Sequence, residues 1–137
     1  MNFSQKTIFI SIVLLLTIML FIGQHNSCDT LDVVNASLEI VHGDRRLLGF
    51  NTDRDGLHFG KVSPGATVTK TIFVNYTLPA QVTISANGSL SSWIHLNPAQ
   101  FEIVPLQTQE VKVQLVLPQT GLPGKYTGQV EFCFREK

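Results

Sequence analysis

The feature that most constrains this chain is an uncharged apolar run at residues 8–23, IFISIVLLLTIMLFIG, interrupted only by one serine and one threonine. The run is long for the core of a signal peptide, about 7–15 residues, and slightly short for a membrane span of about 20. Neither Gly23 nor Ser27 is preceded, two positions earlier, by the small residue that a cleavage site requires. The run therefore predicts a retained signal anchor over residues 1–24, with a cleaved signal peptide as the alternative.

Charges on either side of the run indicate its orientation. Lys6 precedes it, whereas Asp29 and Asp32 follow it. The positive-inside bias then places the N-terminus in the cytoplasm and the C-terminal part outside. We expect a single-pass protein of the cell membrane, attached to the membrane through residues 8–23 and carrying an extracytoplasmic domain. Ten basic residues balance ten acidic ones, and this neutrality argues against a nucleic-acid partner, whose binding requires a basic surface.

Beyond residue 30, apolar and polar residues alternate, which is the signature of β-strands. The clearest example is 109–117, QEVKVQLVL, and the other predicted strands are 34–41, 46–50, 56–60, 67–77, 80–86, 101–104 and 126–134. Glycine and proline turns separate these strands, and no amphipathic helical stretch intervenes. The pattern predicts an all-β domain of seven or eight strands over 34–137, in two antiparallel sheets packed face to face. Residues 25–33 are predicted to be a linker.

Four segments then occur in a recognisable order: LHFGKVSPGATVTKTIFVNYT, SSWIHLNP, FEIVPLQTQEVKVQLVLP and GLPGKYTGQVEF. Together they resemble the immunoglobulin-like modules of the Hydin and major-sperm-protein group, which also occur on archaeal cell surfaces. The resemblance covers roughly residues 55–135 and implies an antiparallel immunoglobulin-like sandwich that binds or spaces other components without catalysis. Trp93, in the second segment, is predicted to be a large core residue.

One acidic segment has the beginning of a calcium-binding pattern. Asn51, Asp53 and Asp55 alternate before Gly56, as in the first half of an EF-hand loop, so that their oxygens could converge on one cation. The twelfth position, where that loop needs a bidentate glutamate, is Val62. The alternative is a turn whose carboxylates accept hydrogen bonds from nearby backbone N–H groups. Calcium is the one candidate metal, and no other cofactor is expected.

The familiar catalytic and zinc-binding patterns are missing from the sequence. Its four histidines share no ligand spacing, and there is no nucleophile elbow, phosphate loop or dinucleotide fingerprint. His58 is predicted to face outward, because Leu57 and Phe59 are the inward residues of its strand. The chain is therefore not expected to be an enzyme.

Three sequons for N-glycosylation follow the apolar run, at Asn35, Asn75 and Asn87. Asn35 and Asn75 alternate with apolar residues, so both are predicted to face water, and Asn87 is predicted to lie in a turn. The sequence thus indicates a glycoprotein, although unused surface asparagines would look the same.

The chain contains two cysteines, Cys28 and Cys133. Both lie on the side of the membrane predicted to be oxidising, where disulfides form. Cys133 alternates with Phe132 and Phe134 and so points away from the core, toward a segment running along the outside. We expect a Cys28–Cys133 disulfide, and the alternatives are two free thiols or an intermolecular bond through Cys28.

Taken together, these patterns predict a noncatalytic, membrane-anchored extracytoplasmic domain that binds or supports an unidentified protein of the cell envelope. An exposed edge strand would give such a domain a general way to bind a partner. The alternatives are a calcium-stabilised adhesion module and an accessory subunit of a membrane complex or filament motor.

Overall fold

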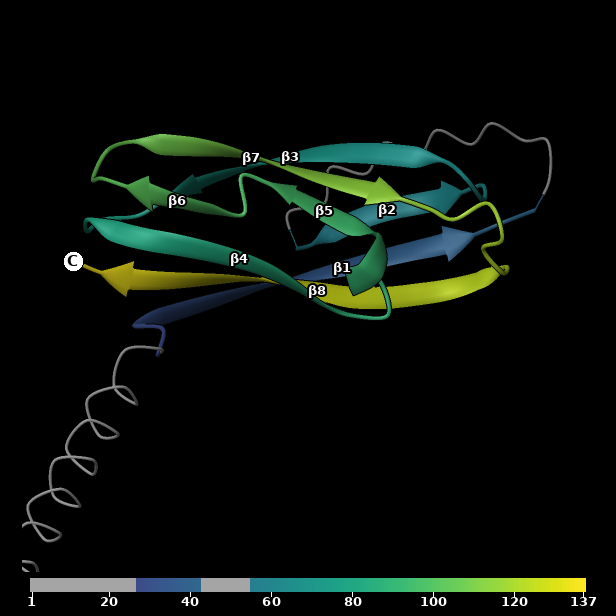
Figure 1. Ribbon diagram of the computed structural model, residues 1–137, viewed down its shortest axis with the longest axis horizontal. Coiled ribbons are helices and arrows are strands. Elements are labelled where there is room, and N and C mark those ends of the chain that lie inside the picture. The colour runs from purple at the N-terminus through teal and green to yellow at the C-terminus, as the bar shows by residue number, and fades with distance from the viewer. Residues whose placement is uncertain (1–26, 43–54) are drawn as a thin grey trace, which may run out of the picture.

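The computed structural model describes residues 27–42 and 55–137, which form eight strands in two facing sheets (Figure 1). The strands are β1 (Thr30–Ile40), β2 (Leu57–Val62), β3 (Thr67–Asn75), β4 (Ala80–Gly88), β5 (Ile94–Asn97), β6 (Gln100–Ile103), β7 (Thr108–Val116) and β8 (Gly124–Glu136), with a short 3-10 helix, η1 (Ser91–Trp93), before β5. One sheet has the order β2-β1-β8-β4-β6 and the other β3-β7-β5. The predicted all-β fold in two sheets is confirmed.

Two predicted elements cannot be compared with this architecture. The signal anchor at 1–24 and the strand at 46–50 lie outside the described residues. Within residues 27–42 and 55–137, no helix is long and apolar enough to cross a membrane.

A single apolar core fills the space between the sheets, and strand alternation builds it. In β7, Val111, Val113 and Leu115 are fully buried, while the residues between them are exposed. The last strand, β8, contributes Phe132 and Phe134 from the opposite sheet. Because successive side chains of a strand point to opposite faces, each alternating segment places its apolar row in this core, as the sequence predicted.

The strand pairing differs from the prediction of uniformly antiparallel sheets. β1 and β2 run parallel, with Ala36 beside Leu57 and Ile40 beside Val62, whereas every other pair of the described strands is antiparallel. Parallel neighbours need a connection long enough to bring the chain back to the starting end of the sheet. Residues 41–56 supply that length, and alternation within a strand carries no information about the direction of its neighbour.

The predicted linker at 25–33 is also too long, because β1 already begins at Thr30. β1 can begin this early because β8 extends to Glu136, so that Thr30 has a pairing partner in Phe134. Residues 30–33 do alternate between polar and apolar side chains, but all four are exposed, so the alternation here does not mark a buried row. The predicted linker is therefore a strand from Thr30 onward.

Trp93 occupies a different place from the one predicted. Its ring is half-buried at the edge of the core and meets the Tyr126 ring edge-on, with 5.0 Å between centroids. Leu90, three residues earlier, is the side chain that is fully buried. The strand after Trp93, β5, was not predicted, because this segment was interpreted as a crossing between strands around Trp93.

Candidate functional site

The described chain begins beside a disulfide bond. Cys28 is bonded to Cys133 of β8, and their Cα atoms are 5.3 Å apart. The predicted pairing is thereby confirmed. Asp29 continues the attachment: its N–H donates to the Phe134 carbonyl at 2.9 Å, and its carboxylate accepts from the Glu136 N–H at 2.8 Å. We call this end of the sheets the Cys28 end.

A tyrosine joins the two sheets at the same end. Tyr76, directly after β3, donates its hydroxyl to Glu136 of β8 at 3.0 Å and lies 2.9 Å from the Thr30 hydroxyl of β1. Its ring also stacks on Phe134, with 4.5 Å between centroids. These contacts and the disulfide fix the first residues of β1 to both sheets.

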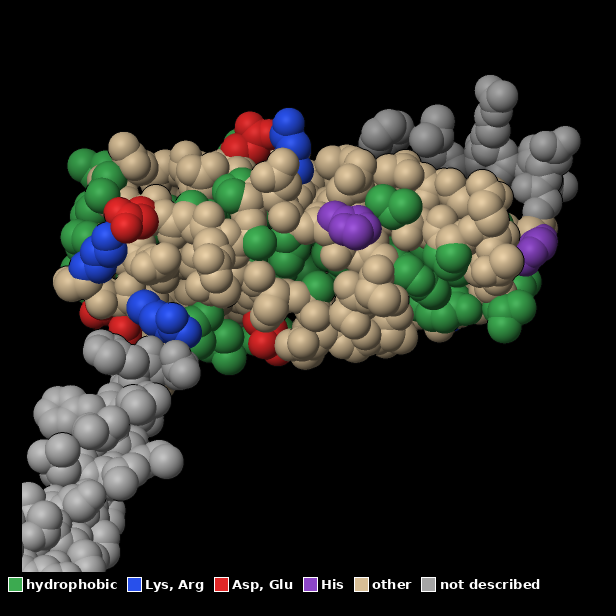
Figure 2. Space-filling view, viewed as in Figure 1, with side chains coloured by type: hydrophobic (Ala, Val, Ile, Leu, Met, Phe, Trp, Pro, Cys, Tyr) green, Lys and Arg blue, Asp and Glu red, His purple; other side chains and the backbone are tan. Residues whose placement is uncertain are grey.

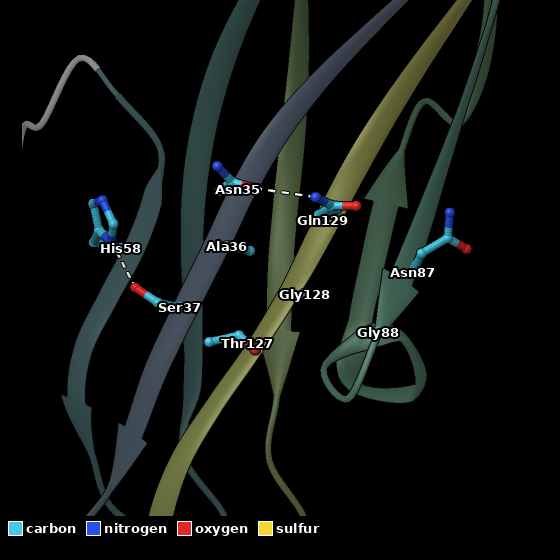
Figure 3. Close-up of a pocket in the computed structure, with 9 residues that line it drawn as sticks. All are labelled: Asn35, Ala36, Ser37, His58, Asn87, Gly88, Thr127, Gly128 and Gln129. Atoms are coloured by element: carbon cyan, nitrogen blue, oxygen red, sulfur yellow. Dashed lines mark hydrogen bonds between the residues drawn. The ribbon is translucent and has the colours of Figure 1, made fainter.

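The outer face of the five-stranded sheet carries a groove, shown in Figure 3, whose exposed lining is mostly carbon with polar groups between. It has a volume of about 380 Å³ and crosses β2, β1, β8 and β4. The residues that line it are Asn35, Ala36, Ser37, His58, Asn87, Gly88, Thr127, Gly128 and Gln129. Amides, hydroxyls and one imidazole supply its polar groups, so the groove offers neutral hydrogen-bond donors and acceptors without a fixed charge.

Cross-strand register explains why three of these amides lie together. Gln129 pairs with Asn35 on one side and with Asn87 on the other, and in a sheet such neighbours stand about 5 Å apart. The Gln129 amide donates to the Asn35 side-chain oxygen at 3.2 Å (Figure 3). The row is thus partly ordered, and the free amide groups of Asn87 and Asn35 remain available to a ligand.

Two facing glycines set the shape of the strands beneath this row. Gly88 pairs with Gly128, and Gly88 has a φ of 84°, a value that side-chain-bearing residues rarely adopt. A Cβ on Gly128 would stand 2.7 Å from the Asn87 carbonyl oxygen. Both positions therefore require glycine for the two strands to approach as they do.

Ser37, His58 and Asp55 form a short chain at one side of the groove. The Ser37 hydroxyl is hydrogen-bonded to His58 Nδ1, and His58 Nε2 lies 3.4 Å from an Asp55 carboxylate oxygen. The residue types match those of a serine hydrolase triad. However, the Asp55 side chain is 81% exposed, so water screens its charge from the imidazole. Ser37 also lies within β1, between β2 and β8, and not on the exposed strand-to-helix turn that presents the serine of a nucleophile elbow.

The structure separates the three sequons into two sites. Asn35 and Asn87 line the groove, while Asn75 ends β3 in the other sheet. All three are exposed, so the prediction that Asn35 and Asn75 face water is confirmed. Asn87 does not lie in a turn as predicted but belongs to β4, because its pairing with Gln129 extends that strand through Gly88.

Of the three residues predicted to bind calcium, Asp55 is the one that the structure describes. Asn51 and Asp53 lie outside the described residues. Asp55 is exposed beside His58 just before β2, and the described residues hold no group of three or more metal-binding side chains. His58 faces outward between buried Leu57 and Phe59, as predicted.

The groove itself was not predicted from the sequence, because its lining comes from four strands whose register no local pattern reveals. The available signal was the set of polar residues at outward positions of separate strands. Comparisons with protein-family models, with curated proteins and with solved structures found no match to this chain.

Proposed function

We propose that this chain is a noncatalytic, membrane-anchored immunoglobulin-like domain that binds or supports another component outside the cytoplasm. The observation that carries the proposal is the Cys28–Cys133 disulfide. Structural disulfides persist in oxidising compartments and are rare in the cytosol. Since Cys28 follows the apolar run 8–23 by only five residues, the same bond supports an anchor that leads directly into an exported domain.

The strand order supports the immunoglobulin-like part of the proposal. In that fold one sheet contains strands B, E and D as neighbours and the other G, F and C. The order β3-β7-β5 corresponds to B-E-D, and β8-β4 corresponds to F-C. β1 takes the position of G, antiparallel to β8. In this chain the N-terminal strand β1 would therefore occupy the place beside β8 that the C-terminal strand G occupies beside strand F in the immunoglobulin fold.

The groove is the proposed recognition site of this domain. Its amides and hydroxyls suit hydrogen bonding to a neutral polar partner, such as a peptide backbone or a saccharide. The aspartate behind the Ser37–His58 pair is exposed to solvent, which weakens its effect on the imidazole and favours binding over catalysis.

The location is tested with intact cells that express the full chain. A membrane-impermeant maleimide should label Cys28 and Cys133 only after treatment with a membrane-impermeant reductant. Labelling without reductant would show free thiols, and labelling only after permeabilisation would place the domain in the cytoplasm. Either result contradicts the proposal.

Recognition is tested by placing a photocrosslinking amino acid at Thr127, at the edge of the groove. Lys112, which is exposed on β7 of the other sheet, is the matched control position. We expect specific adducts in native membranes from Thr127 and none from Lys112. Equal adducts from both positions would exclude the groove as the binding face.

A further inference from the structure

The exposed apolar side chains of the described residues are distributed unequally along the strands. Toward the Cys28 end lie Leu31, Val33, Phe73, Leu78, Val104 and Leu106, whereas Val116 and Leu122 lie toward the other end. Figure 2 shows hydrophobic side chains at the left end of the domain, where Figure 1 places the C-terminus and the β3–β4 and β6–β7 turns, and a second group toward the lower right. Such concentrations of exposed apolar surface mark contacts with a protein or a membrane.

Three of these residues form one projecting tip. Leu78 lies in the turn between β3 and β4, and Val104 and Leu106 lie in the turn between β6 and β7. β4 pairs with β6 and β3 with β7, so the two turns cross between the sheets side by side. Leu78, Val104 and Leu106, called here the apolar tip, are exposed by 46%, 44% and 103% respectively.

Leu106 is held in a conformation that its side chain disfavours. The Gln107 N–H donates to the Val104 carbonyl at 3.1 Å, which closes a turn with Pro105 as its second residue. Leu106 is the third residue, with a φ of 67°. That position of a type II turn favours glycine, and a bulky residue there is strained. Since the side chain is also fully exposed, neither packing nor backbone geometry accounts for a leucine at this point.

We propose that the apolar tip rests in the interface of the lipid bilayer that the N-terminal anchor enters. The inference depends on the proposed anchor. From residue 23 to Cys28 the chain spans at most about 17 Å, and Cys28 is bonded to β8 at the end that carries the tip. The anchor therefore keeps the tip close to the membrane, where even weak insertion is favoured by a high effective concentration.

Charge next to the tip is compatible with a lipid surface. Glu102 of β6 lies close to the β6–β7 turn, and its carboxylate is 2.6 Å from the Lys137 ammonium. This ion pair reduces the repulsion that an isolated carboxylate would feel from lipid phosphates. The carboxylates of Asp29 and Glu136 at the same end are hydrogen-bonded to the Glu136 N–H and to the Tyr76 hydroxyl, respectively. They lie on strand ends rather than in the two turns that carry the apolar tip, so the apolar side chains can enter the interfacial region while these charges stay at headgroup level. The groove, farther along β8, stays clear of the bilayer.

Depth-dependent fluorescence quenching tests the proposal on the full chain reconstituted in phosphatidylcholine vesicles with brominated acyl chains. Leu106→Trp reports on the tip, and Leu122→Trp, at a 73% exposed position toward the other end, is the matched control. Trp93, whose partner Tyr126 pairs with Leu38 far from the Cys28 end, gives the background emission, which is measured on the unsubstituted chain and subtracted from both variants. We expect brominated lipid to quench and blue-shift the emission of Leu106→Trp, and to leave Leu122→Trp at the background of the unsubstituted chain.

A further variant shows which side chains are responsible. Adding Leu78→Asp and Val104→Asp to Leu106→Trp should abolish the extra quenching, because charged tips do not enter the interface. Equal quenching at the two tryptophan positions would overturn the proposal. A blue shift that grows with protein density but is insensitive to bromine would show that a second copy covers the tip, and would also overturn it.

Extraction with alkaline carbonate separates this outcome from failure of the proposed anchor. If the chain is released from the vesicles, the anchor is wrong and the inference falls with it. If the chain is retained while Leu106→Trp is not quenched, the anchor stands and the tip does not contact lipid.

Discussion

Breaking the Cys28–Cys133 bond is expected to lower the stability of the domain by a large fraction. The bond joins residues that are 105 positions apart. In the loop-entropy treatment, a closed loop of that length restricts the unfolded chain enough to contribute about 4.8 kcal/mol at 25 °C. Domains are stable by only about 5–15 kcal/mol, and about 1 kcal/mol corresponds to 4–8 °C in Tm for a domain of this size. Reduction should therefore lower Tm by about 20 °C or more.

The structure also indicates where the reduced protein opens first. β2 pairs with β1 only from Ala36 onward, so among the described strands the backbone of residues 30–35 pairs with β8 alone. Hydrogen exchange in this segment should accelerate on reduction before exchange in β7 does. The assay compares oxidised chain, reduced and alkylated chain, and Cys28→Ser/Cys133→Ser by thermal melting. If the reduced chain and the double variant both melt within about 5 °C of the oxidised protein, the loop-entropy reasoning does not hold here.

Three further outcomes are expected from single sites. Leu106→Gly should raise Tm by a few degrees, because the relief of about 1–2 kcal/mol of left-handed strain exceeds the entropic cost of glycine; Leu106→Ala, which keeps Cβ, should not. Gly128→Ala should lower the free energy of unfolding by about 1–3 kcal/mol in denaturant titration, because the new Cβ would collide with the Asn87 carbonyl oxygen. The control is Thr127→Ala at the exposed neighbouring position, which should change the free energy of unfolding by less than about 0.5 kcal/mol. A fluorophosphonate probe should leave Ser37 unlabelled, and labelling that is lost in Ser37→Ala would contradict a noncatalytic role.

The sequence predicts those parts of the fold that depend on one strand at a time. The inward row of β7 and the outward position of Cys133 both follow from alternation, which is a local property. The parallel pairing of β1 with β2 does not, because it depends on how a distant segment returns to the sheet. β5 was missed although Ile94 and Leu96 alternate with His95 and Asn97, because so short a segment next to Trp93 fits a crossing between strands as well as a strand.

The same distinction explains the outcome for the candidate site. The Cys28–Cys133 pair could be predicted because the chain has two cysteines and because the alternation with Phe132 and Phe134 places the Cys133 side chain on the outer face of its strand. The groove requires Asn35, Gln129 and Asn87 to share one cross-strand row, and that row exists only once the register of β1, β8 and β4 is set. Two sequons that seemed independent in the sequence therefore lie at one surface.

This shared position couples glycosylation to recognition, because a glycan on Asn35 or Asn87 would stand in the groove itself. A glycan there and a protein partner in the groove should exclude one another, whereas the exposed Asn75, in the other sheet, should not affect binding. The test is to measure sequon occupancy by mass spectrometry in the photocrosslinked and the uncrosslinked chains. Adducts should be depleted in glycans at Asn35 and Asn87 and unchanged at Asn75. Adducts that carry both groove glycans would mean that the partner binds elsewhere or recognises the glycans, and would remove the bare groove as the recognition site.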